Sequence, residues 1–91
     1  MTAKRRDELT ALPNIGVKLA AMLRAAGIRT KNDIRHIGAA AIYRRLQATS
    51  EKHLPVCYYL YSLEGAVRGV HWNVLTDREK HALRRDAGLP R

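Results

Sequence analysis

The stretch that decides the fold is "LPNIGVKLAAMLRAAG", Leu12 to Gly27, in which a short turn precedes a helical segment. Pro13 ends any helix before it, because the residue in front of a proline is disfavoured in the helical conformation. Asn14 and Gly16 are residue types that tolerate unusual backbone angles. Ile15 between them is expected to point into the core and anchor the turn.

This order of helix, turn and helix is the pattern of a helix-hairpin-helix, and it predicts an anion site. The N–H groups of Gly16, Val17 and Lys18 would point outward at the start of a helix, where the helix dipole favours negative charge. Lys18 adds a mobile cation. Such a site contacts phosphates and not bases, so binding would be independent of sequence and sensitive to salt.

The alternative is that the turn only joins two helices. The usual second residue of such hairpins is glycine, and here it is Asn14, whose side chain would occupy space near a phosphodiester. Hairpins of this type also often work in pairs. The segment "DIRHIGAAAIYRRL" resembles the first hairpin only weakly and lacks the proline.

Charge points toward a polyanionic partner. The 91 residues include 17 Lys and Arg against 8 Asp and Glu, a formal net charge of +9. Residues 1–50 hold ten basic and three acidic residues, and residues 51–91 hold seven and five. A basic half suggests nucleic acid or an acidic protein face. We therefore add Arg24, Lys31 and Arg35 to the candidate interface of Asn14, Gly16, Val17 and Lys18. The alternative is that each of these arginines and lysines lies on a solvent-exposed face and binds no partner.

The remaining patterns are helical, and no sustained period-two alternation indicates a strand. We expect helices over about residues 6–12, from 16 to a C-cap at Gly27, from 31 to Gly38, over 39–48, from 54 or 55 to about 70, and from 77 to Gly88, with a loop at 49–53. This predicts an all-α, compact bundle of five to six short helices, SAM-like, forming a single domain over 1–91. Residues 1–5 would be a flexible basic arm.

Several local contacts can be predicted from spacing. Thr30 with Asp33, and Thr76 with Glu79, have the spacing of capping boxes. Glu64 stands four residues before Arg68, the order that favours an ion pair on a helix.

Glycine and aromatic positions give further expectations. Gly65 and Gly69 lie on one helix face, where missing side chains would let another helix approach closely. Trp72 is expected to be buried under a turn. The tyrosines are expected in the core or at its rim.

No catalytic or metal constellation is visible. The chain has no C-x-x-C or H-x₃-H pair and no glycine-rich phosphate loop, and nothing assembles a nucleophile with a base. Its single cysteine, Cys57, excludes an intrachain disulfide and fits a reducing cytosol. No apolar run reaches the roughly 20 residues of a membrane helix, and no secretory signal is present. We expect a cytoplasmic non-enzyme with no cofactor, metal, membrane or small-molecule substrate.

Two separated stretches, "LPNIGVKLAAMLRAAGI" and "LYSLEGAVRGVHWNVL", together with the capped last helix, resemble the C-terminal domain of the TfoX/Sxy family. The resemblance covers about residues 7–87, and "LEGAVRGVHWN" carries most of its specificity. It implies a compact all-α domain similar to helix-hairpin-helix and SAM-like folds. It also implies a bacterial cytoplasmic protein concerned with transcription or DNA, in a family associated with natural competence. Full-length members carry an N-terminal domain, so this chain is expected to be a stand-alone copy.

Two functions follow from the sequence. The first is a small DNA-associated regulator that contacts phosphates without sequence preference. The alternative is a SAM-like interaction module that binds a transcription factor or a second copy of itself.

Overall fold

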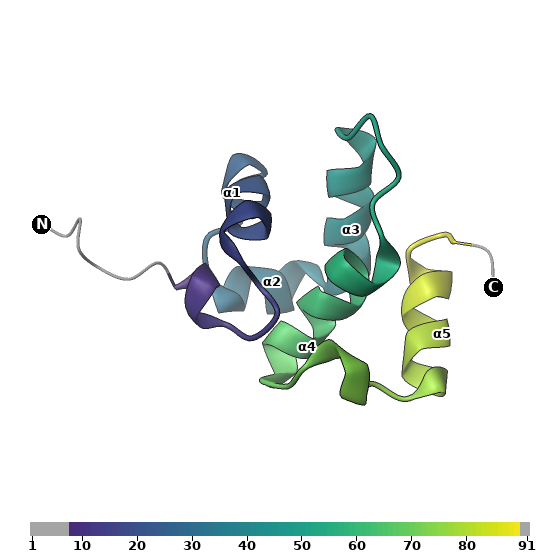
Figure 1. Ribbon diagram of the computed structural model, residues 1–91. Helices are drawn as coiled ribbons and strands as arrows, with labels where there is room; N and C mark the ends of the chain where they lie inside the picture. The colour runs from purple at the N-terminus through teal and green to yellow at the C-terminus, as the bar shows by residue number, and fades with distance from the viewer. Residues whose placement is uncertain (1–7, 90–91) are drawn as a thin grey trace, which may run out of the picture.

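The computed structural model describes residues 8–89, and within them it contains five α-helices and no strand. The predicted all-α fold is therefore confirmed. Figure 1 shows α1 on one side of the molecule and α5 on the other, with the remaining helices between them. The helices are α1 (Val17–Ala25), α2 (Lys31–Ile37), α3 (Ala39–Ala48), α4 (Ser62–Arg68) and α5 (Asp77–Asp86).

The chain also makes three short helical turns. Two are 3₁₀ turns, η1 (Leu9–Ala11) and η3 (Trp72–Val74), and one is a π turn, η2 (Cys57–Tyr61).

The helix expected over residues 6–12 is wrong in its described part, where only η1 forms. Leu12 already has extended backbone (ψ 148°), as the residue before a proline prefers. A single hydrogen-bonded turn does not repay the cost of nucleating an α-helix. The segment is held instead by Leu9, which is fully buried. Residues 6 and 7, like the predicted basic arm, lie outside the described residues.

The predicted helix ends are largely confirmed. Thr30 and Thr76 each accept a hydrogen bond from the backbone N–H three residues on, and Asp33 and Glu79 complete the two capping boxes. Gly27 adopts a positive φ of 85° just after α1, a backbone conformation that residues with a Cβ rarely adopt. These local signals fix where α1 ends and where α2 and α5 begin.

The long helix expected from residue 54 or 55 is divided by η2. Its π-helical turn adds a residue to the helical cycle, and Leu60 to Leu63 are four consecutive buried residues, which a one-sided apolar stripe does not give. The hydroxyl of Ser62 donates to the Cys57 carbonyl at 3.1 Å, one of the acceptors at this turn. Together η2 and α4 form the centre of the domain, with α2, α3, α5 and η3 packed around them (Figure 1).

Buried apolar side chains come from η1, α1, α2, α3, η2 and α4 and from the connections between elements, whereas α5 and η3 contain no buried residue. Along the segment from η2 to the end of α4, Leu60 and Leu63 are buried, whereas the flanking Val56, Val67 and Val70 are half-buried. The largest fully buried side chains are Leu9, Leu23, Ile28, Ile34, Ile42, Tyr43, Leu60 and Leu63.

The loop at residues 49–53, which the sequence predicted, is fastened to α3. Tyr43 donates its hydroxyl to the Leu54 carbonyl at 2.7 Å, and the Leu54 N–H donates to Gln47 Oε1 at 2.8 Å. The Gln47 amide in turn donates to the Lys52 carbonyl at 2.9 Å. Burial raises the pKa of Tyr43, which keeps its hydroxyl protonated as a donor.

Candidate functional site

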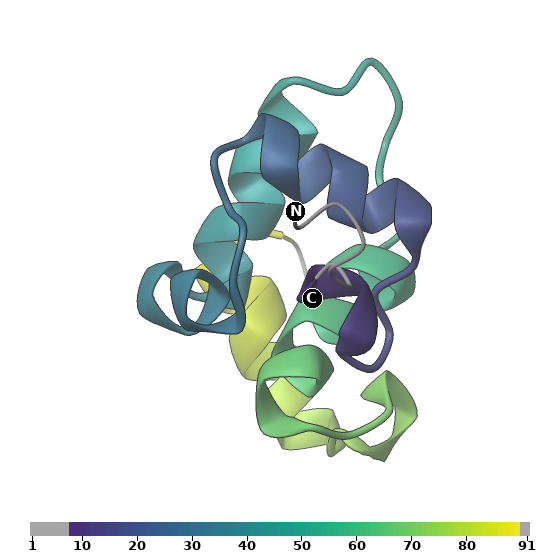
Figure 2. The same cartoon turned by 90° about the vertical axis from the view of Figure 1, so that its left-hand side faces the viewer.

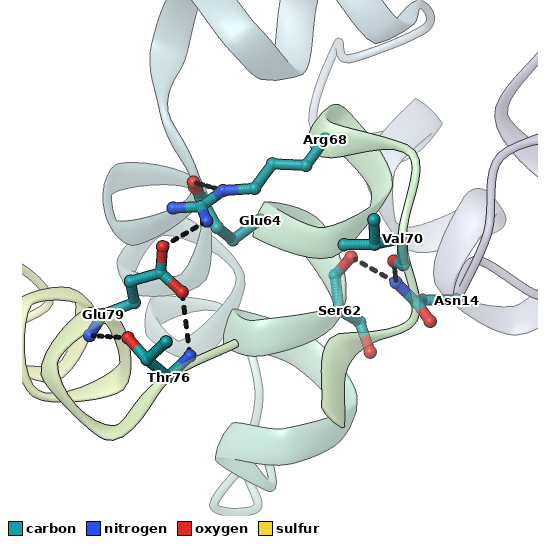
Figure 3. Close-up of polar contacts among 7 residues, drawn as sticks. All are labelled: Asn14, Ser62, Glu64, Arg68, Val70, Thr76 and Glu79. Carbon is teal, nitrogen blue, oxygen red and sulfur yellow. Dashed lines mark hydrogen bonds and ion pairs between the residues drawn. The ribbon is translucent and has the colours of Figure 1, made fainter. Parts of the chain in front are cut away.

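The turn at Leu12–Gly16 is held in place by the side chain of Asn14. This residue adopts φ 70°, the left-handed region that asparagine tolerates better than most residues. Its Nδ2 donates to the carbonyls of Val70 (2.9 Å) and Ser62 (3.3 Å), and its Oδ1 accepts from the Trp72 N–H at 3.3 Å. Figure 3 shows the two carbonyl contacts. The amide group of Asn14 is thus used inside the fold, a role that sequence reasoning missed.

Gly65 makes this contact possible. A Cβ at position 65 would lie 2.6 Å from Asn14 Nδ2 and 2.7 Å from the Val70 carbonyl oxygen, closer than real Cβ contacts. The predicted close approach at Gly65 is therefore confirmed. The neighbours, however, are Asn14 in the turn and residues 70 and 72 after α4, and not another helix. The same prediction is wrong for Gly69, where an added Cβ would meet no atom within 4 Å and where the residue ends α4 with φ 78°.

The start of α1 is exposed and carries no side-chain cap. Gly16 is the N-cap, with φ −95°, and a Cβ at this position would meet no heavy atom within 4 Å. The first turn of α1 contains no acidic residue, and Val17 is 77% exposed. The first N–H groups of any α-helix lack partners within that helix. At α2 and α5 the capping boxes meet this need, whereas at α1 the donors of Val17 and Lys18 face an open surface.

The structure brings only part of the predicted interface together. Asn14, Gly16, Val17 and Lys18 lie at the start of α1, where the sequence placed them. Arg24 is in the last turn of α1, about 9 Å further along the helix axis. Lys31 and Arg35 belong to α2, which follows the far end of α1 (Figure 2). The predicted interface residues therefore fall into two groups, one at the start of α1 and one spread over the last turn of α1 and over α2.

The start of α2, where Lys31 lies, makes structural contacts of its own. The Lys31 backbone N–H donates to the Glu8 carboxylate at 3.1 Å, which ties η1 to the start of α2. Arg29 and Thr30 direct their N–H groups to Asp33, and the hydrogen bond from Arg29 is the main reason that the pKa of Asp33 is lowered. The N-terminus of α2 is thus occupied by carboxylates, in contrast to that of α1.

A groove of about 830 Å³ opens beside the start of α1, and we call it the Tyr58 groove. It contains four lysine or histidine side chains and three aromatic ones but no carboxylate. Tyr58 is 65% exposed, which contradicts the expectation of core or rim packing. The residues that line the Tyr58 groove are Asn14, Gly16, Lys18, Leu19, Met22, Ser50, Lys52, His53, Leu54, Pro55, Tyr58, Tyr59, Ser62, His71 and Trp72.

Trp72 forms one wall of this groove and is half-buried, whereas the sequence predicted burial. Its ring meets Tyr58 edge-on, with centroids 6.5 Å apart and planes at 79°. Tyr61 lies 6.4 Å away on the core side, and Lys80 Nζ lies 5.7 Å from the Trp72 ring, a cation–π distance. The ring is therefore braced by neighbours from η2 and α5 while it still borders the groove.

Arg68 joins α4 to α5 through two carboxylates (Figure 3). Its Nε lies 2.8 Å from Glu64, which confirms the predicted ion pair, and a terminal guanidinium nitrogen lies 2.5 Å from Glu79. The hydrogen bond from Arg68, followed by the N–H of Thr76, lowers the pKa of Glu79, and the two carboxylates raise the pKa of Arg68. These charges are paired with one another, so this cluster stabilises the helix packing.

The described residues offer neither a metal site nor a membrane span. Across residues 8–89, no group of three or more His, Cys, Asp or Glu side chains is placed to hold a metal ion. None of the helices in this part of the chain is long and apolar enough to cross a membrane.

The structure defines a small all-α domain with an open helix start beside a cationic, aromatic groove. The chain belongs to the TfoX C-terminal domain family, whose model matches residues 5–87. This family is linked to the regulation of competence and is not a known enzyme family.

Two curated relatives support this assignment. The chain is 31% identical over 81 residues to the DNA transformation protein TfoX1 of Aliivibrio fischeri, covering 89% of this chain and 38% of that protein. It is 34% identical over 70 residues to protein Sxy of Escherichia coli, covering 77% of this chain and 32% of Sxy. The chain thus matches about a third of the length of each of these relatives.

Two crystal structures from Listeria monocytogenes have the same fold. One, of an uncharacterized protein in a triclinic form, is 34% identical with a TM-score of 0.75 and covers 84% of both chains. The other, of a protein of unknown function in a tetragonal form, is 32% identical with a TM-score of 0.76. It covers 88% of this chain and 96% of that one.

Proposed function

We propose that this chain is a non-enzymatic, cytoplasmic regulatory domain that contacts the phosphate backbone of DNA. The contact is made at the Leu12–Gly16 turn, by the N–H groups of Gly16, Val17 and Lys18 and by the Lys18 ammonium group. Asn14 does not contact the phosphate in this proposal; its side chain holds the turn against α4. Binding of this kind is independent of base sequence, because phosphates carry no sequence information.

The single observation that carries this proposal is the open start of α1. Gly16 provides no side chain to cap the helix, and no acidic residue stands in the first turn. A phosphate oxygen placed there would accept from the free N–H groups and would interact favourably with the helix dipole. The formal net charge of +9 adds long-range attraction to a polyanion.

The three cationic residues on the last turn of α1 and on α2 have a subordinate role in this proposal. Arg24, Lys31 and Arg35 would raise the local positive potential and would contact phosphates further along the backbone. Their removal would weaken binding in proportion to the charge lost. One curated relative is named a DNA transformation protein, which favours DNA as the polyanion.

A salt titration of binding to a random-sequence DNA duplex tests the proposal. Affinity should fall linearly on logarithmic axes as salt rises, in the way expected when bound phosphates release counterions. No detectable binding at low salt would overturn the proposal.

Gly16→Ala is the sharpest variant for the same assay. A methyl group at position 16 meets no heavy atom within 4 Å, and φ −95° is allowed for alanine, so the fold should be unaffected. The methyl group would lie beside the proposed phosphate position, and we expect binding to weaken several-fold. Ala41→Ser, at an exposed position of α3, adds one heavy atom elsewhere and should bind as the wild type. Equal affinity for the two variants would exclude the turn as the contact.

The second candidate is an interaction module that binds a transcription factor or a second copy of the chain. Its supporting observation is that Val17 and Val74 are 77% and 59% exposed, so that both apolar side chains are accessible to a partner. Light scattering over a range of protein concentrations and a pull-down from lysate test it. A monomer that retains DNA and no protein would count against this candidate.

A further inference from the structure

We infer that the Tyr58 groove binds an unpaired segment of single-stranded DNA, with a base stacked on Tyr58 beside Trp72. This inference rests on the proposed function and deepens it, because it names the form of DNA and adds a contact with the base. The groove also supplies cations for the adjacent phosphates, namely Lys18 and Lys52.

The groove is large enough to hold a nucleotide. Its volume of about 830 Å³ lies within the range of roughly 300–1,000 Å³ found for ligand pockets. Lys18 at the start of α1 lines the same cavity as Tyr58 in η2, so the proposed phosphate contact and the aromatic surface share one space. A nucleotide with its phosphate at one end and its base at the other therefore has partners for both parts.

The aromatic surface is both exposed and braced. Tyr58 is 65% exposed although its neighbours on both sides along η2 are half-buried. Its contact with Trp72 is edge-on, at 79° between planes, so the contact does not cover both faces of the Tyr58 ring. A ring held in this way offers a face to a base without further ordering, and base–aromatic stacking tolerates any sequence.

The charges in the groove select a polyanion. Lys18, Lys52, His53 and His71 line it, and no carboxylate does. Lys52 and His53 are exposed, on the loop that α3 fastens in place. An acidic backbone is complementary to the two lysines, and a neutral peptide would leave their charges without partners.

The base must be unpaired to reach the ring. In a duplex each base is covered by its neighbours in the stack, so its face is available only when the strand is single or the base is flipped out. Contact with phosphates alone does not distinguish single from double strands. Stacking on Tyr58 does, and it makes the two proposals separable.

Tryptophan fluorescence provides the test, because Trp72 is the only tryptophan of the chain. A thymidine oligonucleotide should quench Trp72 fluorescence on binding, while a blunt duplex of the same length should bind with little quenching. Tyr58→Ala should weaken binding of the oligonucleotide by about 5- to 150-fold, the range of losing one stacked base. Tyr58→Phe keeps the ring and should bind as the wild type. Val74→Ala removes an exposed apolar side chain outside the groove and is the matched control.

Each outcome has a distinct meaning. If Tyr58→Ala binds the oligonucleotide as tightly as Val74→Ala does, the stacking site is wrong, while binding to the duplex would still support the proposed function. If neither form of DNA binds, the proposed function fails first. If a uridine oligoribonucleotide binds more tightly than the thymidine oligonucleotide, assignment of the groove to DNA is overturned.

Discussion

The side-chain amide of Asn14 lies 2.6 Å from the point where a Cβ at position 65 would stand. Because residue 65 is glycine, the amide reaches past it to the backbone of Ser62, Val70 and Trp72. The turn before α1 is thereby fixed on α4 by residues far away in the sequence. The direction in which the N–H groups of α1 point depends on this contact.

Gly65→Ala is expected to destabilise the domain by about 1–3 kcal/mol, the usual cost of overpacking a filled site. The free energy of unfolding in urea measures this loss. In an Asn14→Gly background one of the two short contacts is absent, so the cost of Gly65→Ala should fall by at least about 0.5 kcal/mol. Strict additivity of the two substitutions would show that the Asn14 amide is not the group in the way.

Asn14→Asp should destabilise the domain by about 1–3 kcal/mol at neutral pH. Aspartate tolerates the positive φ, but a carboxylate has no N–H for the Val70 and Ser62 carbonyls and would repel them. The charged form is disfavoured there, so the loss relative to the wild type should shrink as acid protonates the new carboxyl. Urea unfolding of both proteins at neutral and at acidic pH measures this difference, and a larger loss in acid would contradict it.

Glu79 should make stability depend on pH in the acid range. Its folded-state pKa lies below its ordinary value of 4.5, chiefly because Arg68 donates to it. The stabilisation is therefore complete above pH 4.5 and is lost as pH falls through the folded-state pKa. Glu79→Gln should give a flatter curve of unfolding free energy against pH below 4.5. Parallel curves for the two proteins would show that the ion pair adds nothing.

Tyr43→Phe should cost about 1–2 kcal/mol, because it leaves the Leu54 carbonyl without its buried hydroxyl donor. Thermal unfolding measures the loss. Tyr58→Phe, at the exposed tyrosine, is the control and should stay within about 0.5 kcal/mol of the wild type. Similar losses in the two variants would argue against a specific role for the Tyr43 hydroxyl.

Lys18→Gln should lower the magnitude of the logarithmic salt slope of DNA binding by about 1, since one phosphate contact is lost. Arg78→Gln removes the same charge from α5 and should leave the slope almost unchanged. Binding isotherms over a range of salt concentrations supply both slopes. Equal changes for the two variants would mean that net charge, and not the turn, sets the salt dependence.

The sequence predicted the helices where short-range signals mark their ends. The capping pairs Thr30–Asp33 and Thr76–Glu79, the left-handed Gly27 and the Glu64–Arg68 pair were all readable, because the interacting groups lie within four residues. The prediction of a helix before Pro13 was wrong because the sequence pattern does not show whether the segment is long enough to offset the free-energy cost of nucleating an α-helix. The π turn at Cys57–Tyr61 was missed because apolar periodicity does not distinguish it from α-helix.

What the sequence by itself determined is the all-α class, the family and the residues at the start of α1. Only the tertiary structure decided the position of Asn14, whose three hydrogen bonds join residues 48, 56 and 58 positions apart. It also decided that Lys18, Lys52, Tyr58 and Trp72 line one groove, whereas Arg24, Lys31 and Arg35 lie elsewhere. Local propensity acts over a few residues, but a groove is made by packing helices that are distant in sequence.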